Sequence, residues 1–180
     1  MYELSAKNDR LKQAMENLSV MDTEEKYSAL VVLPTGGGKT YTASTWLLKH
    51  AIDRNKKILW LAHRHTLLEQ AAESFQKYAY ATTIPHTSSF TYRIISGAVA
   101  HDRAVDIKAK DNILIASKDS IGRNLPALNS WLKGEDELYL VIDEAHHSTA
   151  KTYRKVIEYL QKKVKPSQIN RLDRNAVPHR

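Results

Sequence analysis

The sequence predicts an α/β fold in which a parallel β-sheet carries helices on both faces. Three observations lead to this prediction. Short apolar runs alternate along the 180-residue chain with longer helix-compatible segments, as expected for strands that are buried on both faces. A glycine-rich turn joins the first apolar run to a helix-compatible segment. The last apolar run ends in two consecutive carboxylates.

Five apolar runs are the predicted strands. They are Ala29–Leu33, Ile58–Ala62, Tyr92–Ser96, Ile113–Ala116 and Leu138–Ile142. Helices are predicted for an opening segment around Leu11, Met15 and Leu18, for Tyr41–His50, for the segment from Leu67 to Phe75, for the polar stretches Ala100–Ala109 and Leu125–Lys133, and for Ala150–Val164. The segment Thr82–Phe90 is predicted to be a loop. Right-handed crossovers in such a sheet place ligand sites at the carboxyl ends of the strands.

The glycine-rich turn has the sequence Leu33-Pro-Thr-Gly-Gly-Gly-Lys-Thr40. Glycines allow backbone N–H groups to curl around phosphate oxygens, and the N-terminus of the following helix adds the positive end of its dipole. Lys39 can then reach the β- and γ-phosphates, and the Thr40 hydroxyl can hold Mg²⁺. The full P-loop pattern has Gly or Ala where Leu33 stands, so the alternative is an ordinary glycine-rich turn before Lys-Thr.

The acidic pair is Asp143 and Glu144, directly after the run Leu138–Ile142. An aspartate in this place binds Mg²⁺ through water, and a glutamate orients or deprotonates the attacking water in phosphoryl transfer. The alternative is a polar strand end that begins a loop. The pair follows the glycine-rich turn by roughly one hundred residues, a separation that suits one α/β domain.

Together these segments resemble the first motor domain of superfamily 2 helicases and translocases with an Asp-Glu-Ala-His box. The segment Ile58 to Gln70 is similar to motif Ia of that family, and Ile113 to Ile121 is similar to a later motif that contacts nucleic acid. Tyr153-Arg154 after the acidic box is also typical of it. The resemblance covers most of Leu11 to Val164 and is strongest to restriction-enzyme motors and repair helicases.

This resemblance implies a RecA-like, P-loop NTPase domain that uses ATP and Mg²⁺. The implied catalytic residues are Lys39, Asp143 and Glu144, and the implied metal ligands are Thr40 and Asp143. The implied ATP-binding residues are Gln13, Thr35, Gly36, Gly37, Gly38, Lys39 and Thr40. His146 would couple nucleotide state to the rest of the motor, and Arg64 and Ser117 would hold nucleic-acid phosphates.

Each of these residues also has a structural alternative. Gln13 could be a solvent-exposed helical glutamine, and Arg64 could form a surface salt bridge. Ser117 begins the sequence Ser-Lys-Asp-Ser, which is typical of a helix N-cap, and one residue can serve both roles. His146 could be a hydrogen-bonded structural histidine. A zinc site built from His63, His65, His146 and His147 is disfavoured, because the chain has no cysteines and no His-Glu-x-x-His helix.

Composition points to a polyanionic partner. The chain has 27 lysines and arginines against 20 aspartates and glutamates, a net charge of +7. With the resemblance, this favours nucleic acid, DNA more than RNA, with subunits of a restriction or repair complex as further candidates. The absence of cysteines excludes disulfides and is compatible with a cytoplasmic protein. No signal peptide or membrane-spanning run is expected, so the membrane is excluded as a partner.

The tail from 165 to 180 departs from the family. The resemblance calls for another strand ending in Thr-Ala-Thr-Pro, whereas the tail is polar and has no strand signal. Permitted codons for Ile169 to Arg180, read one base later, encode Leu-Thr-Gly-Leu-Thr-Ala-Thr-Pro-Tyr-Arg. We therefore expect a motor domain at 1–164, incomplete at its C-terminus, followed by an aberrant or disordered tail that is an out-of-frame remnant of this motif. The alternative is a divergent natural C-terminus.

The expected function is that of an ATP-binding, nucleic-acid-contacting motor domain with little activity by itself, because a second motor domain is absent. One alternative is a non-catalytic, truncated module that binds nucleic acid or a partner. Another is an unrelated P-loop ATPase or kinase, which motif Ia and the acidic box disfavour.

Overall fold

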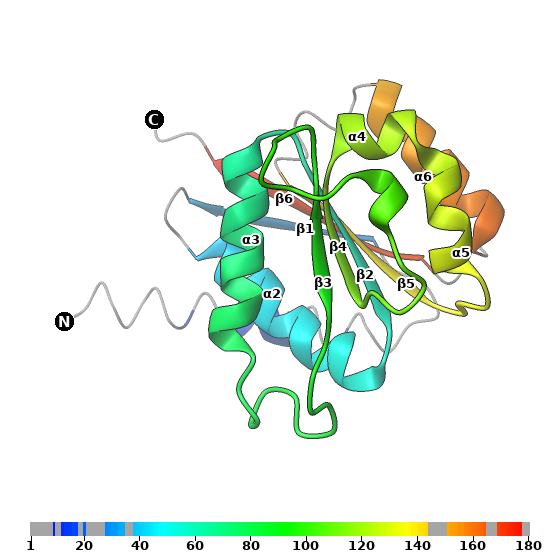
Figure 1. Cartoon of the computed structure of the whole chain (residues 1–180). Coiled ribbons are helices and arrows are strands. Elements are labelled where there is room, and N and C mark those ends of the chain that lie inside the picture. Colours follow the sequence, from blue (N-terminus) through cyan, green and yellow to red (C-terminus); the bar gives the residue numbers. More distant parts are fainter. Residues whose placement is uncertain are drawn as a thin grey trace.

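The computed structural model describes residues 9, 12–17, 20, 28–34, 38–143, 151–164 and 169–177, with the backbone alone for 28–34 and 169–177. Within these residues the strands form one sheet in the order β1-β6-β5-β2-β4-β3, and every neighbouring pair is parallel. Helices cover both faces of this sheet (Figure 1). The α/β fold class predicted from the sequence is therefore confirmed.

The five predicted strands agree with the structure to within one residue at each end. They are β1 Ser28–Pro34, β2 Lys57–Ala62, β3 Tyr92–Ile95, β4 Ile113–Ser117 and β5 Leu138–Asp143. The helices are α2 Lys39–His50, α3 His65–Tyr78, α4 Lys118–Arg123, α5 Asn129–Leu132 and α6 Lys151–Lys163, and residues 12–17 are also helical. Short 3₁₀ turns are η1 Ile52–Arg54, η2 Ala104–Asp106 and η3 Leu125–Leu128.

The core consists of two apolar layers, one on each face of the sheet. Alternate residues of a strand point to opposite faces, so Trp60 of β2 packs with α2 and α3, whereas Leu59 and Leu61 pack with α4, α5 and α6. Buried residues recur every three to four positions along α6 and just after it, as the sequence predicts, and they are Tyr153, Val156, Leu160 and Val164. None of the described helices is long and apolar enough to cross a membrane.

The prediction of a helix over Ala100–Ala109 is wrong. Only the short turn η2 is helical there. The segment before η2 returns to the edge strand β3, where the N–H of Asp102 donates to the carbonyl of Ile94 and the N–H of Ser96 donates to the carbonyl of Asp102. These backbone groups therefore pair with a strand, and the same groups are not free to form a helix.

The tail also differs from the sequence-based expectation, because the backbone of Ile169–Val177 forms a strand, β6, between β1 and β5. A parallel ladder is made by backbone N–H and C=O groups, which polar residues carry as well as apolar ones. A segment between two strands forms backbone hydrogen bonds with a neighbour on each side, and these bonds do not require an apolar sequence pattern. The expectation of a tail without a strand is thus corrected for 169–177.

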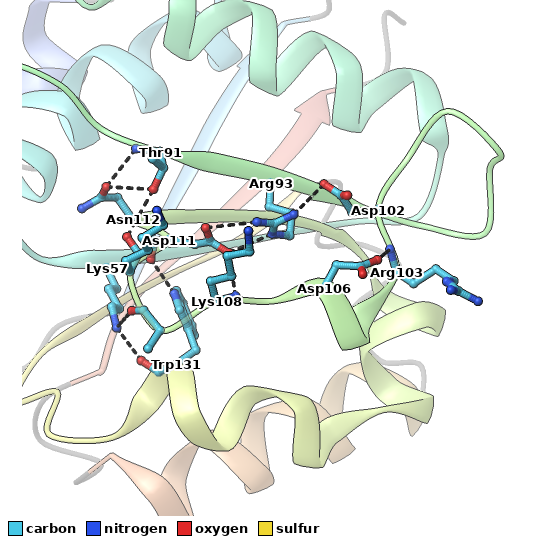
Figure 2. A network of polar contacts seen from close by, with 12 residues as sticks. Lys57, Thr91, Arg93, Asp102, Arg103, Asp106, Lys108, Asp111, Asn112 and Trp131 are labelled. Atoms are coloured by element: carbon cyan, nitrogen blue, oxygen red, sulfur yellow. Dashed lines mark hydrogen bonds and ion pairs between the residues drawn. The ribbon is translucent and has the colours of Figure 1, made fainter.

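A polar network ties together the amino ends of β2, β3 and β4 (Figure 2). Lys57, the first residue of β2, donates to the backbone carbonyls of Ala109 and Trp131 and forms an ion pair with Glu135 at 2.8 Å. Beside β3 and β4, the side chain of Asn112 accepts a hydrogen bond from the backbone N–H of Thr91. These contacts fix the edge of the sheet opposite to the one where the candidate site residues lie.

Candidate functional site

The candidate site residues lie at the carboxyl edge of the sheet. Lys39 begins α2 a few residues after β1 ends, and Asp143 is the last residue of β5. Register links the two strands through β6, because Val31 of β1 and Asp143 of β5 both pair with Arg174. Since neighbouring strands lie about 4.8 Å apart, the backbones of β1 and β5 are about 10 Å apart at this level. Lys39 and Asp143 therefore share one edge.

Gly38 shows why this turn needs glycine. It is the N-cap of α2 with φ 82° and ψ 22°, in the left-handed region that residues with a Cβ adopt at a cost. Its carbonyl accepts hydrogen bonds from the N–H of Thr42 at 2.8 Å and from the Thr42 hydroxyl at 3.0 Å. A glycine N-cap has no side chain to satisfy the first-turn N–H groups of the helix, which is the arrangement that favours an anion there.

The second motif supplies a buried carboxylate. Asp143 is only 4% exposed, and it ends a strand whose six residues are all buried. Lys39 and Thr40 are half-buried in the first turn of α2. A hydroxyl and a carboxylate are the hard oxygen donors that Mg²⁺ prefers, so Thr40 and Asp143 fit the metal that the resemblance implies. Thr35, Gly36, Gly37, Glu144 and His146 lie outside the described residues.

Arg64 and Ser117 lie at the carboxyl ends of two neighbouring strands. Ala62 of β2 pairs with Ser117 of β4, and Arg64 follows Ala62 by two residues. Arg64 is the N-cap of α3 and is exposed, and it forms no ion pair with any residue that the structure describes. The Oγ of Ser117 accepts a hydrogen bond from the N–H of Ser120 at 3.2 Å, which confirms the predicted N-cap of α4.

Gln13 is exposed, and its Nε2 donates to Oδ1 of Asn17 at 3.0 Å, as expected for a glutamine on a helix surface. The helical residues 12–17 face α2 across a cavity of about 850 Å³. Tyr41, Thr45 and Trp46 of α2 line this cavity. Sequence analysis missed the exposed Tyr41, which packs edge-on against Tyr78 of α3, because only the tertiary fold brings these rings together.

Sequence analysis also missed a cluster above the first turns of α3. His101 is bonded to Ser96, faces Glu69 and packs against the ring of His65. Among the described residues, no group of three His, Cys, Asp or Glu side chains is arranged to hold a metal ion. The contacts of His101 join the loop after β3 to α3.

The parallel sheet, with a glycine-led helix after β1 and a buried aspartate at the end of β5, agrees with the RecA-like domain that the resemblance implies. The family model described as type III restriction enzyme, res subunit, matches residues 5–165. The chain belongs to this family.

Solved structures support the same fold. The chain is similar to a DEAD box protein from Methanococcus jannaschii (19% identity, TM-score 0.57, covering 84% of this chain and 40% of that one). It is similar to the Hef helicase domain of Pyrococcus furiosus (22% identity, TM-score 0.57, covering 90% of this chain and 32% of that one). It is also similar to the UvsW helicase of bacteriophage T4 (19% identity, TM-score 0.54, covering 81% of this chain and 46% of that one). The chain thus spans less than half the length of these structures. No curated protein matches it significantly in sequence.

Proposed function

We propose that this chain is the ATP-binding, nucleic-acid-contacting motor domain of a superfamily 2 helicase or translocase. The observation that carries the proposal is the shared edge. The strand β1, which leads to Gly38 and the start of α2, is separated by the single strand β6 from β5, which ends in the buried Asp143. A cationic helix start and an acidic strand end complement the triphosphate and the metal ion of MgATP.

Each site residue then has a defined role. Lys39 would contact the β- and γ-phosphates, together with the backbone N–H groups of Thr35 to Gly38. Thr40 and Asp143 would hold Mg²⁺, which would neutralise charge on the phosphates. Glu144 would orient the attacking water, His146 would couple the nucleotide to the rest of the motor, and Gln13 would contact the adenine edge.

Nucleic acid lies along the carboxyl ends of β2 and β4. Arg64 is exposed there, and Ser117 is buried at the end of the neighbouring strand β4. Contacts of this kind hold the phosphate backbone and do not read sequence. The net charge of +7 supports a polyanionic partner. DNA is the proposed polymer, since the matching family is described by a restriction-enzyme subunit.

The chain alone is expected to hydrolyse ATP slowly. In motors of this class a second domain supplies arginine fingers, which contribute on the order of 10³–10⁵ in rate. The present chain covers 32% to 46% of the related structures, and its described residues form a single sheet with its helices.

A nucleotide-binding assay tests the proposal. Lys39→Ala should weaken binding of a fluorescent ATP analogue in Mg²⁺ by at least about ten-fold, since 1.4 kcal/mol of lost phosphate contact gives that factor. Lys49→Ala removes an exposed lysine from the last turn of the same helix and should leave the affinity unchanged. Equal affinity of the wild type and the Lys39→Ala variant would contradict the proposed site.

The second candidate is a non-catalytic, truncated module that binds nucleic acid or a partner. It is favoured by the net charge of +7 and the exposed Arg64 at the carboxyl edge, which suit a polyanion without requiring hydrolysis. Binding of single-stranded DNA without any binding of nucleotide would select this candidate. Its origin as an out-of-frame product is tested by the coding DNA, which must read Thr-Ala-Thr-Pro one base on within the codons of Ile169 to Arg180.

A further inference from the structure

The turn that follows β3 exposes an apolar side chain in full. Its sequence is Gly97-Ala98-Val99-Ala100, and Val99 is as exposed as a side chain in an extended peptide. Turns are usually built from Gly, Pro, Asn, Asp and Ser, whose polar groups or backbone freedom suit them. A turn tipped by a β-branched apolar residue therefore has no local structural reason for its composition.

This turn has a defined conformation. The Oγ of Ser96 accepts a hydrogen bond from the N–H of Ala98 at 3.0 Å and lies 2.6 Å from Nδ1 of His101. The N–H of His101 donates to the carbonyl of Ala98 at 3.1 Å. Val99 is thus held at the tip of a closed loop, and ordering it on contact with a partner costs little conformational entropy.

His101 anchors the loop to α3. Its side chain is only 5% exposed, its Nε2 lies 3.3 Å from Oε1 of Glu69, and its ring meets the ring of His65 edge-on with centroids 5.8 Å apart. His65 is the first residue of α3 and directly follows Arg64. The apolar tip is therefore fixed beside the residue proposed to hold a nucleic-acid phosphate.

The loop lies at the carboxyl edge of the sheet. β3 is the edge strand next to β4, and Ile95 pairs with Ala116, which places Ser96 at the level of Ser117. In Figure 1 the loop crosses the same end of the sheet as the starts of α3 and α4. Val99, Arg64 and Ser117 therefore belong to one side of the molecule.

The charges around the loop favour a polyanion. Arg64, before α3, and Arg103, before η2, are both exposed. The acidic groups nearby have partners within the protein: Asp102 forms an ion pair with Arg93 at 3.0 Å, Glu69 faces His101, and Asp106 accepts a hydrogen bond from the N–H of Arg103. A fixed apolar tip on the same side of the molecule as the exposed Arg64 complements a strand whose phosphates lie outside and whose bases present apolar faces.

We propose that Val99 is a wedge that packs against a nucleobase of the bound nucleic acid. The inference rests on the proposed nucleic-acid function and adds a base contact to the phosphate contacts of Arg64 and Ser117. Apolar side chains inserted between bases are a known means of distorting nucleic acid, and contact with the base face does not depend on sequence. The alternative is that Val99 docks into an apolar groove of a partner protein, and the test must distinguish this from contact with a nucleobase.

The test uses the 180-residue chain and a single-stranded DNA that carries 2-aminopurine, a base whose fluorescence reports stacking. Val99→Ser should weaken binding by about three- to ten-fold, at the low end of what loss of a base contact costs, and should abolish the fluorescence change at one position of the strand. Tyr80→Ser is the matched control. Tyr80 is also exposed, but it lies in the loop after α3, at the other end of that helix.

A gain-of-signal variant complements this loss. In Val99→Trp a new exposed indole should be quenched when DNA binds, and the affinity should rise. Tyr80→Trp places an indole away from the edge and should show no quenching. His101→Ala removes the anchor and should weaken binding with Val99 still present, and a thermal melt checks that the fold is kept.

The outcomes distinguish the two proposals. If the wild type binds neither DNA nor RNA at low salt, the nucleic-acid function and the wedge are both overturned. If the wild type binds DNA but Val99→Ser binds equally well and Val99→Trp is not quenched, the wedge alone is overturned. Loss of a protein contact in Val99→Ser with DNA binding unchanged would assign the tip to a protein groove and would also overturn the wedge.

Discussion

Arg93 of β3 and Asp111, two residues before β4, form a buried ion pair in which Nε of Arg93 lies 2.8 Å from Oδ2 of Asp111 (Figure 2). The carboxylate also accepts a hydrogen bond from the N–H of Lys108, and its backbone carbonyl accepts one from Nε1 of Trp131. Arg93 reaches Asp102 on its other side. Asp111 thus joins β3 to α5, since its carboxylate binds Arg93 and its backbone carbonyl binds Trp131.

Removal of this carboxylate should destabilise the protein strongly. The side chain of Asp111 is 3% exposed and that of Arg93 is 15% exposed. Asp111→Ala removes the hydrogen bonds that the carboxylate accepts from Arg93 and from the N–H of Lys108, and it leaves the half-exposed Asp102 as the remaining acidic partner of Arg93. The free energy of unfolding should therefore fall by about 2 kcal/mol. Urea unfolding measures this. The exposed pair of Lys56 and Asp136 is the control, and Asp136→Ala should cost less than about 1 kcal/mol.

The same pair predicts a pH dependence. Burial raises the pKa of Asp111, but the hydrogen bond and charge of Arg93 and the N–H of Lys108 outweigh it and hold this pKa below its usual value of 3.8. A carboxyl with a lowered folded pKa stabilises the protein above pH 3.8, and this contribution is lost as the pH falls through the folded pKa.

The stability difference between the wild type and Asp111→Asn should therefore be constant from neutral pH down to about pH 5 and shrink below pH 4. Denaturant unfolding at a series of pH values gives this difference, and the subtraction removes the other acids, including Asp53 and Asp136, whose pKa values are also lowered. A difference that grows on acidification would show that the pair does not favour the ionised carboxylate.

A buried hydroxyl pair joins α2 to α3. The Oγ atoms of Ser44 and Ser74 are 2.5 Å apart, and Ser44 also donates to the carbonyl of Thr40 at 2.6 Å, so Ser74 is the donor between the two serines. Ser44→Ala and Ser74→Ala should each cost about 1 kcal/mol. The double variant should cost less than the sum, because the second change removes a bond that is already lost. Additive losses in urea unfolding would mean that the hydroxyls are not coupled.

Two glycines with similar backbone angles allow the effect of backbone strain on stability to be distinguished from an effect on nucleotide binding. Gly38 has φ 82° and Gly134 has φ 80°, and a Cβ at Gly134 would meet no atom within 4 Å. Alanine at either position should cost about 1 kcal/mol of stability. Only Gly38→Ala should also weaken binding of the ATP analogue, by about ten-fold or more. Equal nucleotide affinity of the two variants would place the phosphates away from α2.

The cap of α4 gives a further stability prediction. Ser117→Ala removes the acceptor of the Ser120 N–H and should cost about 1 kcal/mol, whereas Ser117→Thr keeps a hydroxyl and should cost less. Thermal unfolding compares the two variants. If the alanine variant loses DNA affinity at a temperature where it is fully folded, Ser117 serves both as a cap and as a phosphate contact.

Much of the fold follows from local patterns. Buried parallel strands such as β2 and β5 read as continuous apolar runs, and α6 shows its inner face through Tyr153, Val156 and Leu160. The strand β6 could not be predicted in this way, because its backbone pairing leaves no apolar pattern in the sequence.

The residues of the candidate site could be predicted where they lie at or near the ends of predicted strands. Gly38, Asp143 and Ser117 lie at the ends of predicted strands or beside them, and the N-cap of Ser117 is visible in its local sequence. The contact between His101 and Glu69 is not visible there, because it joins residues from different elements that only the folded chain brings together. The conformation of the Val99 turn depends on such contacts.

The order of the sheet makes the two ends of the described chain depend on each other. Among the described residues, β6 is the strand with which β1 pairs, and β6 also pairs with β5. Proteolytic release of 169–177 would leave β1 without a lateral neighbour, beside a remnant of the four strands β5, β2, β4 and β3. The helix α2 and the strand β5, which carry the proposed nucleotide site, are thus parts of one cooperative unit, and cleavage before 169–177 would uncouple them.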